Sequence, residues 1–197
     1  MTSVTVAPDL DFRFRLLEAM AACIVQDGYR GTTVADVVRQ ARTSRRTFYQ
    51  HFPDKEACFV ALLADTNARM IKEITAAVDP HAPIPDQIRQ AIQAWIRCAE
   101  SAPAITLSWI RDVPALGTTA RRLQRDTTAA FTTMIQTLCD TDQWRAAGLG
   151  QVSRESAVML LGGLRELTAT TVEDGGRIRD LTEVAVRSAI ALLGAST

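Results

Sequence analysis

A short stretch near the N-terminus carries the residues whose chemistry is clearest. Five basic residues fall between positions 39 and 55, against the single acid Asp54: Arg39, Arg42, Arg45, Arg46 and Lys55. The surplus is local, because the whole chain has 22 Lys plus Arg and 22 Asp plus Glu. Arginine and lysine neutralise phosphates and donate to base edges, so the stretch indicates a polyanionic partner. The alternative is a solvated surface, which is what an Arg-Arg pair by itself most often is.

Two short helices must position these residues. We expect one over 34–40 and another that begins after Ser44 and runs to His51, joined by Ala41-Arg42-Thr43. A shared apolar face holds them together, made of Val34, Val37, Val38, Ala41 and Phe48. This pattern predicts a helix-turn-helix. The second helix then presents a compact polar surface, small enough for a major groove, made of Arg45, Arg46, Thr47, Tyr49 and Gln50.

Helix starts add a second kind of phosphate contact. Thr33, Ser44 and Lys55 each lie at or beside the first residue of an expected helix. Exposed N–H groups give a helix N-terminus partial positive charge. All three residues are therefore candidate phosphate contacts.

The stretch from Phe14 to Leu63 also resembles the N-terminal domain of TetR-family transcriptional regulators. The matching positions are Gly28-Tyr29, Thr32-Thr33-Val34-Ala35-Asp36-Val37, Ser44, Thr47-Phe48-Tyr49, His51-Phe52 and Asp54-Lys55-Glu56. The resemblance implies an N-terminal three-helix DNA-binding domain, with Ala41, Phe48 and Phe52 in its core. It implies phosphate contacts from Thr33, Tyr49, His51 and Lys55, and a base-reading surface of Arg45, Arg46 and Thr47.

The turn between the two short helices departs from the family. Where the family usually has Gly-Val, this chain has Arg42-Thr43. A left-handed residue other than glycine costs roughly 1 kcal/mol or more. We therefore expect either a reshaped turn or an Arg42 side chain that reaches a phosphate, and a same-fold adaptor that binds a protein instead of DNA stays the alternative function.

The rest of the chain is predicted to be helical as well. Apolar residues recur at three- and four-residue steps, and strict alternation over a strand's length is hard to find. We predict an all-α protein of about nine helices with two domains. Residues 1–54, with an N-terminal arm over 1–10, form the DNA-binding domain, and residues 55–197 form a larger ligand-binding and dimerisation domain. Besides the two short helices, we expect helices near 11–26, 55–78, 85–103, 104–112, 117–140, 153–172 and 180–193, with a loop around 148–150.

In the resembled family the middle of the second domain encloses an effector pocket. The candidates here are Met70, Trp95, Cys98, Trp109, Ile110, Phe131, Met134, Ile135, Leu138, Leu164 and Thr168. Their character predicts a small apolar effector, although the same residues would also suit an ordinary core. A polar anchor could come from Arg111, Asp112, Arg165 or Thr168.

The last two helices are candidates for a homodimer contact that would set two reading helices about 34 to 36 Å apart on a palindromic operator. Gly162-Gly163 interrupts an apolar helix, where each glycine costs about 1 kcal/mol relative to alanine. Close approach of another helix would explain them. The interface candidates are Leu160, Gly163, Leu164, Leu167, Val184, Ser188 and Leu192, with packing inside one chain as the alternative. The expected mechanism is repression relieved by ligand.

Other function classes find little support. The four cysteines are 35, 40 and 41 residues apart, so neither a metal site nor a disulfide framework is expected. Motifs typical of zinc proteases, serine hydrolases, P-loop proteins and dinucleotide-binding enzymes are missing from the sequence. We expect a protein that is not an enzyme, has no cofactor and no membrane segment, and is cytoplasmic.

Overall fold

The computed structural model describes residues 8–194, and within that range the chain is helical throughout, as predicted. The helices are α1 (Pro8–Gly31), α2 (Val34–Gln40), α3 (Arg45–His51), α4 (Lys55–Ala77), α5 (Ile84–Ser101), α6 (Pro103–Arg111), α7 (Thr118–Cys139), α8 (Asp142–Ala146), α9 (Arg154–Glu173) and α10 (Thr182–Leu193), with 3-10 turns at Val113–Ala115 and Ile178–Leu181. About nine helices were expected, and the helix that the prediction lacked is α8. It lies where only a loop was anticipated, and Thr141 caps its start.

The first helix begins earlier and ends later than expected. Its backbone is helical from Pro8, so only residues 1–7 of the anticipated arm remain, and these lie outside the described residues. The helix continues to Gly31 through a kink at Gly28, where φ is 69° and ψ is 166°. A left-handed φ of this kind is readily adopted only by glycine. The non-helical Gly28 therefore interrupts α1 just after residue 26, where the first helix was expected to end.

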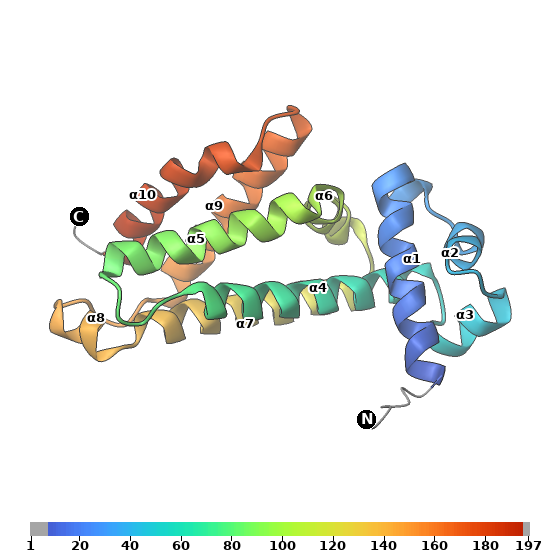
Figure 1. Ribbon diagram of the computed structural model, residues 1–197, viewed down its shortest axis with the longest axis horizontal. Coiled ribbons are helices and arrows are strands. Elements are labelled where there is room, and N and C mark those ends of the chain that lie inside the picture. The colour runs from blue at the N-terminus through green and yellow to red at the C-terminus, as the bar shows by residue number, and fades with distance from the viewer. Residues whose placement is uncertain (1–7, 195–197) are drawn as a thin grey trace, which may run out of the picture.

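Helices α1, α2 and α3 form a compact unit at one end of the elongated molecule (Figure 1). Its core includes Leu16, Met20, Val37 and Phe48, each with an exposed fraction of 0%. The unit also takes in the first half of α4 and parts of α6, through Phe59, Leu63, Ile105 and Trp109 among others. The three-helix unit is thus packed directly onto the rest of the chain.

The turn between α2 and α3 keeps its left-handed residue despite the missing glycine. Arg42 has a φ of 50° and is the sole non-glycine residue with positive φ among residues 8–194. Its N–H donates to Arg39 O at 3.1 Å and the Thr43 N–H donates to Val38 O at 2.9 Å, which is the Schellman pattern of a helix end. The Arg15 guanidinium also donates to Ala41 O at 2.6 Å. The turn is therefore not reshaped, and Arg42 takes the strained position itself.

Lys55 joins the start of α4 to the end of α1. Its ammonium donates to Tyr29 O at 3.0 Å and to Thr32 O at 2.9 Å, and lies 4.3 Å from the centre of the Tyr29 ring. Burial lowers the pKa of this ammonium. These hydrogen bonds direct the ammonium toward the end of α1, and the phosphate contact predicted for Lys55 stays a prediction.

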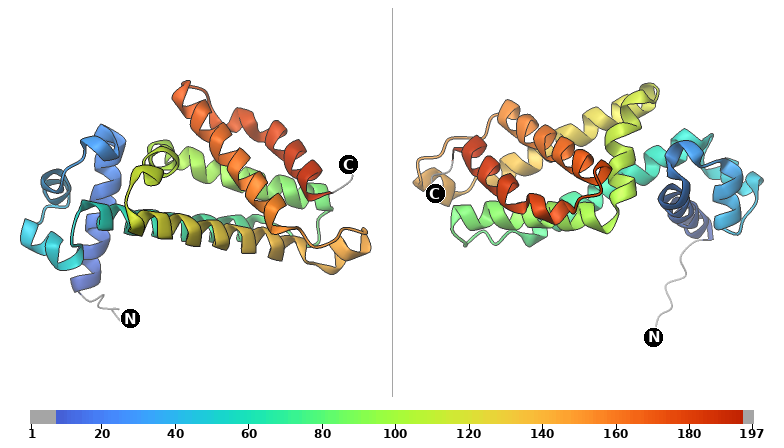
Figure 2. Two further views of the ribbon diagram at one scale, coloured as in Figure 1. Left: turned by 180° about the vertical axis from the view of Figure 1, so that it is seen from behind. Right: turned by 90° about the horizontal axis from the view of Figure 1, so that it is seen from above.

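The second core lies between α4, α5, α7, α9 and α10. It contains Ile74, Trp95, Phe131, Trp144 and Leu161, together with other apolar residues of these helices. Helix α4 runs along the length of the molecule, and α9 and α10 cover one side (Figures 1 and 2). The predicted boundary between the two domains, after residue 54, thus falls at the start of a helix that packs into both cores.

The left-handed turn makes a testable prediction about stability. We expect Arg42→Gly to unfold with a free energy about 1 kcal/mol higher than Arg42→Ala, because alanine keeps the steric strain of a positive φ. Both variants lose the same side chain, so urea denaturation compares the backbone term alone. The control is Arg39 inside α2, where the free energy of unfolding should instead be about 1 kcal/mol lower for the glycine variant than for the alanine variant. Equal stability of the two Arg42 variants would contradict the left-handed assignment.

Candidate nucleic-acid interface and ligand cavities

Helix α3 is held so that one side is buried and the other faces solvent. Phe48 is fully buried and contacts the ring of Phe52, with the centroids 5.8 Å apart. Because one turn of a seven-residue helix is fixed in this way, Arg45 and Arg46 are exposed and Tyr49 has an exposed fraction of 55%. The outer face of α3 is therefore a small, rigidly held basic surface.

Ser44 fixes the start of this helix. Its hydroxyl accepts from the Thr47 N–H at 3.1 Å and lies 3.0 Å from the Thr47 hydroxyl. Such a cap satisfies one of the free N–H groups at a helix N-terminus. Ser44 and Thr47 thus lie beside the exposed arginines, and the exposed Arg42 lies in the turn just before them.

Thr33 is positioned at the start of α2 by a reciprocal cap. Its hydroxyl donates to Asp36 Oδ2 at 2.6 Å, and that carboxylate also accepts from the Thr33 N–H at 3.0 Å. These hydrogen bonds, chiefly from the Thr33 side chain, lower the pKa of Asp36. In this structure the Thr33 hydroxyl and N–H are both bonded to Asp36, and the predicted phosphate contact of Thr33 stays a prediction.

The nine residues predicted to contact DNA therefore fall into two groups. Seven lie on or directly before α3: Arg42, Ser44, Arg45, Arg46, Thr47, Tyr49 and His51. Of the other two, the Thr33 hydroxyl donates a hydrogen bond to Asp36, and the Lys55 ammonium donates one to a carbonyl at the end of α1. His51 is half-buried at the end of α3, with its ring centroid 6.5 Å from that of Phe52.

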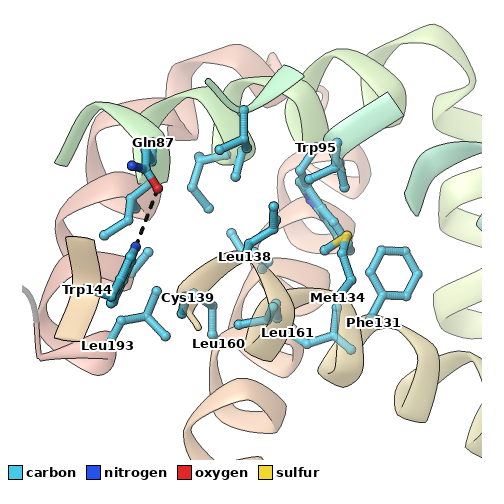
Figure 3. A pocket seen from close by; sticks show the side chains of 18 residues that line it. Gln87, Trp95, Phe131, Met134, Leu138, Cys139, Trp144, Leu160, Leu161 and Leu193 are labelled. Atoms are coloured by element: carbon cyan, nitrogen blue, oxygen red, sulfur yellow. Dashed lines mark hydrogen bonds between the residues drawn. The ribbon is translucent and has the colours of Figure 1, made fainter. Parts of the chain in front are cut away.

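A first cavity of about 70 Å³ lies inside the second core, and apolar side chains line almost all of it. Its lining residues are Ile74, Val78, Gln87, Ile88, Ala91, Ile92, Trp95, Phe131, Met134, Ile135, Leu138, Cys139, Trp144, Leu160, Leu161, Leu164, Ala189 and Leu193. Gln87 and Trp144 meet at one end, and Trp95, Met134 and Phe131 lie at the other (Figure 3). The polar end is internally satisfied, because Gln87 donates to Ala82 O at 2.8 Å and accepts from the Trp144 indole at 3.4 Å.

A second, smaller cavity of about 30 Å³ lies closer to the unit formed by α1, α2 and α3, which we call the reading unit. Its lining residues are Leu63, Thr66, Asn67, Met70, Trp95, Ile105, Thr106, Trp109, Ile110, Phe131 and Arg165. Trp95 and Phe131 line both cavities, with their rings in an edge contact at 5.6 Å between centroids. These two rings therefore form a wall between the two cavities.

The residues predicted for one pocket are divided by this wall. Met134, Ile135, Leu138 and Leu164 line the first cavity, and Met70, Trp109 and Ile110 line the second. Two predicted residues line neither cavity. Cys98 donates from its thiol to Glu73 Oε2 at 3.1 Å, and the Thr168 hydroxyl donates to Leu164 O of its own helix at 2.7 Å.

Sequence reasoning missed the polar end of the first cavity. Gln87 has an exposed fraction of 3% and Trp144 of 2%, yet neither was a candidate. The available signal was Thr141-Asp142-Gln143-Trp144, a capping threonine followed by an aromatic residue in an otherwise polar segment. That pattern predicts a short helix docked through its tryptophan.

The possible polar anchors have different partners. Arg111 clamps α6 to α9 through Glu166 and Glu173, and its bonds to them raise its pKa. Asp112 accepts from Arg30 at 3.0 Å. Of the three charged candidates, only Arg165 lines either cavity.

The predicted dimer residues also separate into an inner and an outer set. Leu160 and Leu164 line the first cavity, and Leu192 is half-buried against the second core, so these three pack within the chain, and their part in a dimer interface stays a prediction. Gly163, Leu167, Val184 and Ser188 are exposed on α9 and α10. Met159 was not predicted, and it has an exposed fraction of 63% on the same helix as Leu167.

The remaining chemical features are simple. All four cysteines are free thiols, and burial raises the pKa of Cys58 and Cys139 to about 12. Within residues 8–194, no three His, Cys, Asp or Glu residues are grouped so that they could hold a metal ion. None of the described helices combines the length and the apolar character that crossing a membrane requires.

Comparison with known proteins places the N-terminal unit in a family. Residues 16–62 match the family model described as bacterial regulatory proteins, tetR family. The HTH-type transcriptional repressor AcnR of Corynebacterium efficiens is 32% identical over 75 residues, which are 38% of this chain and 40% of AcnR. The chain thus matches less than half of the length of this curated relative.

Solved structures extend the likeness in fold to nearly the whole chain. FadR from Bacillus subtilis, solved in complex with stearoyl-CoA, has a TM-score of 0.77 at 14% identity and covers 93% of this chain and 99% of its own. A putative TetR-family regulator from Mesorhizobium loti has a TM-score of 0.71 at 19% identity, covering 96% and 98%. These likenesses show a shared fold, while the sequence match shows the ancestry of the N-terminal unit. Through that match, residues 16–62 are identified as similar to the tetR family of bacterial regulatory proteins.

Proposed function

We propose that this protein is a homodimeric, DNA-binding transcriptional repressor that a small, largely apolar ligand releases from its operator. The observation that carries the proposal is the exposed pair Arg45 and Arg46 on a helix whose other side is locked by Phe48. At 1.5 Å per residue, the seven residues of α3 span about 10 Å, which fits a major groove about 12 Å wide.

The exposed face of α9 and α10 supports the dimer. Met159, Gly163 and Leu167 follow one another at four-residue steps on α9, and all are exposed. A Cβ built on Gly163 would meet nothing within 4 Å, so packing inside the chain does not require glycine there. A second copy lying close to this stripe would account for it. A twofold pair would place two α3 helices on successive turns of a palindromic site.

Helix α4 supports the link between ligand and DNA. Its first half packs with α1 through Cys58, Phe59 and Leu62, and its second half lines the first cavity through Ile74 and Val78. Pockets for small ligands usually have volumes of roughly 300–1,000 Å³, so a ligand of that size would have to displace the walls of this cavity. A ligand that binds better when α4 has shifted must weaken DNA binding by its differential affinity.

The solved FadR complex favours this use of the second core, because its fold is shared and its bound ligand, stearoyl-CoA, carries an acyl chain. We propose that this chain, too, binds a ligand that carries an acyl chain. The coupling route also includes α6, since Ile105 and Trp109 pack in the core of the reading unit.

DNA binding through α3 predicts a steep dependence on salt. Replacing Arg45 and Arg46 with Ala should abolish specific binding and leave helicity unchanged, because both side chains are exposed and neither is part of the core. For the unmodified dimer, neutralising about six to ten phosphates would lower affinity some 10³- to 10⁵-fold between 50 and 200 mM salt. Fluorescence anisotropy with DNA fragments selected from a random pool measures both effects.

A matched control is the adjacent pair Arg121 and Arg122 on α7, which is also exposed. Helix α7 lies on the other side of α1 from α2 and α3 (Figure 1). Alanine at both positions removes the same charge and should retain specific binding. Unchanged DNA affinity of the Arg45/Arg46 variant would remove the reading helix from the proposal. Failure of the unmodified protein to bind any duplex in dilute buffer would favour the adaptor alternative.

The proposed dimer face predicts a change in oligomeric state. Leu167→Glu should convert the dimer to a monomer and weaken operator binding, because two carboxylates would be buried near the twofold axis. The control is Val25→Glu on α1, which also replaces an exposed aliphatic residue, at an exposed fraction of 63%. Sedimentation velocity distinguishes the two species. A Leu167→Glu variant that sediments as a dimer would place the interface elsewhere.

A further inference from the structure

The guanidinium of Arg165 is largely buried and has no counter-ion among residues 8–194. Its Nε and Nη2 atoms are buried and have no hydrogen-bond partner within residues 8–194. The remaining nitrogen, Nη1, lies 3.5 Å from the Thr128 hydroxyl, and the guanidinium lies 5.5 Å from the centre of the Trp109 ring. Burial lowers the pKa of Arg165 to about 10, so the group still carries its charge at neutral pH. A buried charge of this kind is costly unless something pairs with it.

The unpartnered atoms form one edge of the guanidinium, and two other arginines of the chain show what that edge binds. Arg111 uses Nε and Nη2 to hold the two carboxylate oxygens of Glu173, at 2.7 and 2.9 Å. Arg177 uses the same two atoms for the two oxygens of Asp180, at 3.2 and 3.1 Å. A planar carboxylate matches this pair of parallel N–H groups.

Among the described residues, those that line the second cavity with Arg165 include no acid. The indole N–H of Trp95, in the wall that the two cavities share, is also buried without an acceptor. Water in the second cavity could accept from these groups, but it would not balance the charge. An anionic acceptor satisfies both the hydrogen bonds and the charge.

Beyond that wall lies the apolar first cavity. Its far end, at Gln87 and Trp144, is closed by hydrogen bonds within the protein (Figure 3). A ligand that passes Trp95 and Phe131 therefore meets a charged group on one side and apolar side chains on the other. This is the arrangement that an amphipathic molecule with one anionic end requires.

We propose that the effector is a monocarboxylate with an aliphatic chain, whose carboxylate pairs with the Nε/Nη2 edge of Arg165 while the chain enters the first cavity. This rests on the proposed function, since the site is that of the effector. It narrows the ligand from any apolar molecule to an acid, and it names the residue that distinguishes the acid from a neutral molecule with the same chain.

The test compares matched ligands on the full-length chain by isothermal titration calorimetry at pH 7. The ligands are unbranched carboxylates from hexanoate to hexadecanoate and the primary alcohols of equal chain length. A charge-assisted hydrogen-bonded pair predicts that the best carboxylate binds about tenfold or more tightly than its alcohol. In Arg165→Met this preference should disappear while the alcohol binds as before. Arg165→Lys should recover only part of it, because lysine keeps the charge but not the planar edge.

Two controls separate recognition from folding. Without ligand, Arg165→Met should melt at a higher temperature, since an uncompensated buried charge has been replaced by an apolar side chain. Arg125→Met removes an exposed arginine of α7 and should keep the full preference for the acid.

Several results would overturn the assignment. These are equal affinity for acid and alcohol, a preference that survives in Arg165→Met, binding of the acyl-CoA thioester but not of the free acid, and no binding by any ligand in the series. None of these results would contradict operator binding by the ligand-free protein, because the Arg45/Arg46 variant tests that binding separately. If acid and alcohol release DNA equally well, regulation by an apolar ligand stands and the role of Arg165 is lost.

Discussion

The structure depends on the packing of α4 into two hydrophobic cores at once. Phe59 and Leu63 near its start are buried with α1, and Met70 and Ile74 further along are buried with α5 and α7. Lys55 ties its first residue to the carbonyls of Tyr29 and Thr32. Because close-packed side chains transmit displacement and do not absorb it, the reading unit and the ligand cavities cannot move independently of this helix.

Among residues 8–194, some buried polar groups are satisfied within the chain and others are not. Gln87 and Trp144 satisfy each other at the closed end of the first cavity, and Arg111 has two carboxylates. Arg165 has the same chemistry as Arg111, but within residues 8–194 its Nε and Nη2 atoms have no hydrogen-bond partner. Native proteins rarely leave such groups unpaired, which is why this one carries information about the ligand.

The sequence was most informative where structure is local. Caps at Thr33 and Ser44 and the spacing of Val37, Val38 and Phe48 predict α2 and α3 well, because caps and amphipathic spacing act within a few residues. The cavities were predicted less well. Their walls come from helices far apart in the chain, so spacing could not show that Trp95 and Phe131 divide two spaces. Nor could it show that the Lys55 ammonium turns toward α1, since charge alone indicates a surface.

The central claim is that α4 connects a ligand in the second core to the position of the reading helix. The most direct measurement is the distance between the two copies of Gln50 on α3, spin-labelled in the dimer and followed by pulsed electron resonance. The account predicts a separation near one DNA turn, about 34 Å, without ligand, and a clear shift when a ligand that releases DNA is added. Release of DNA with an unchanged separation would contradict it.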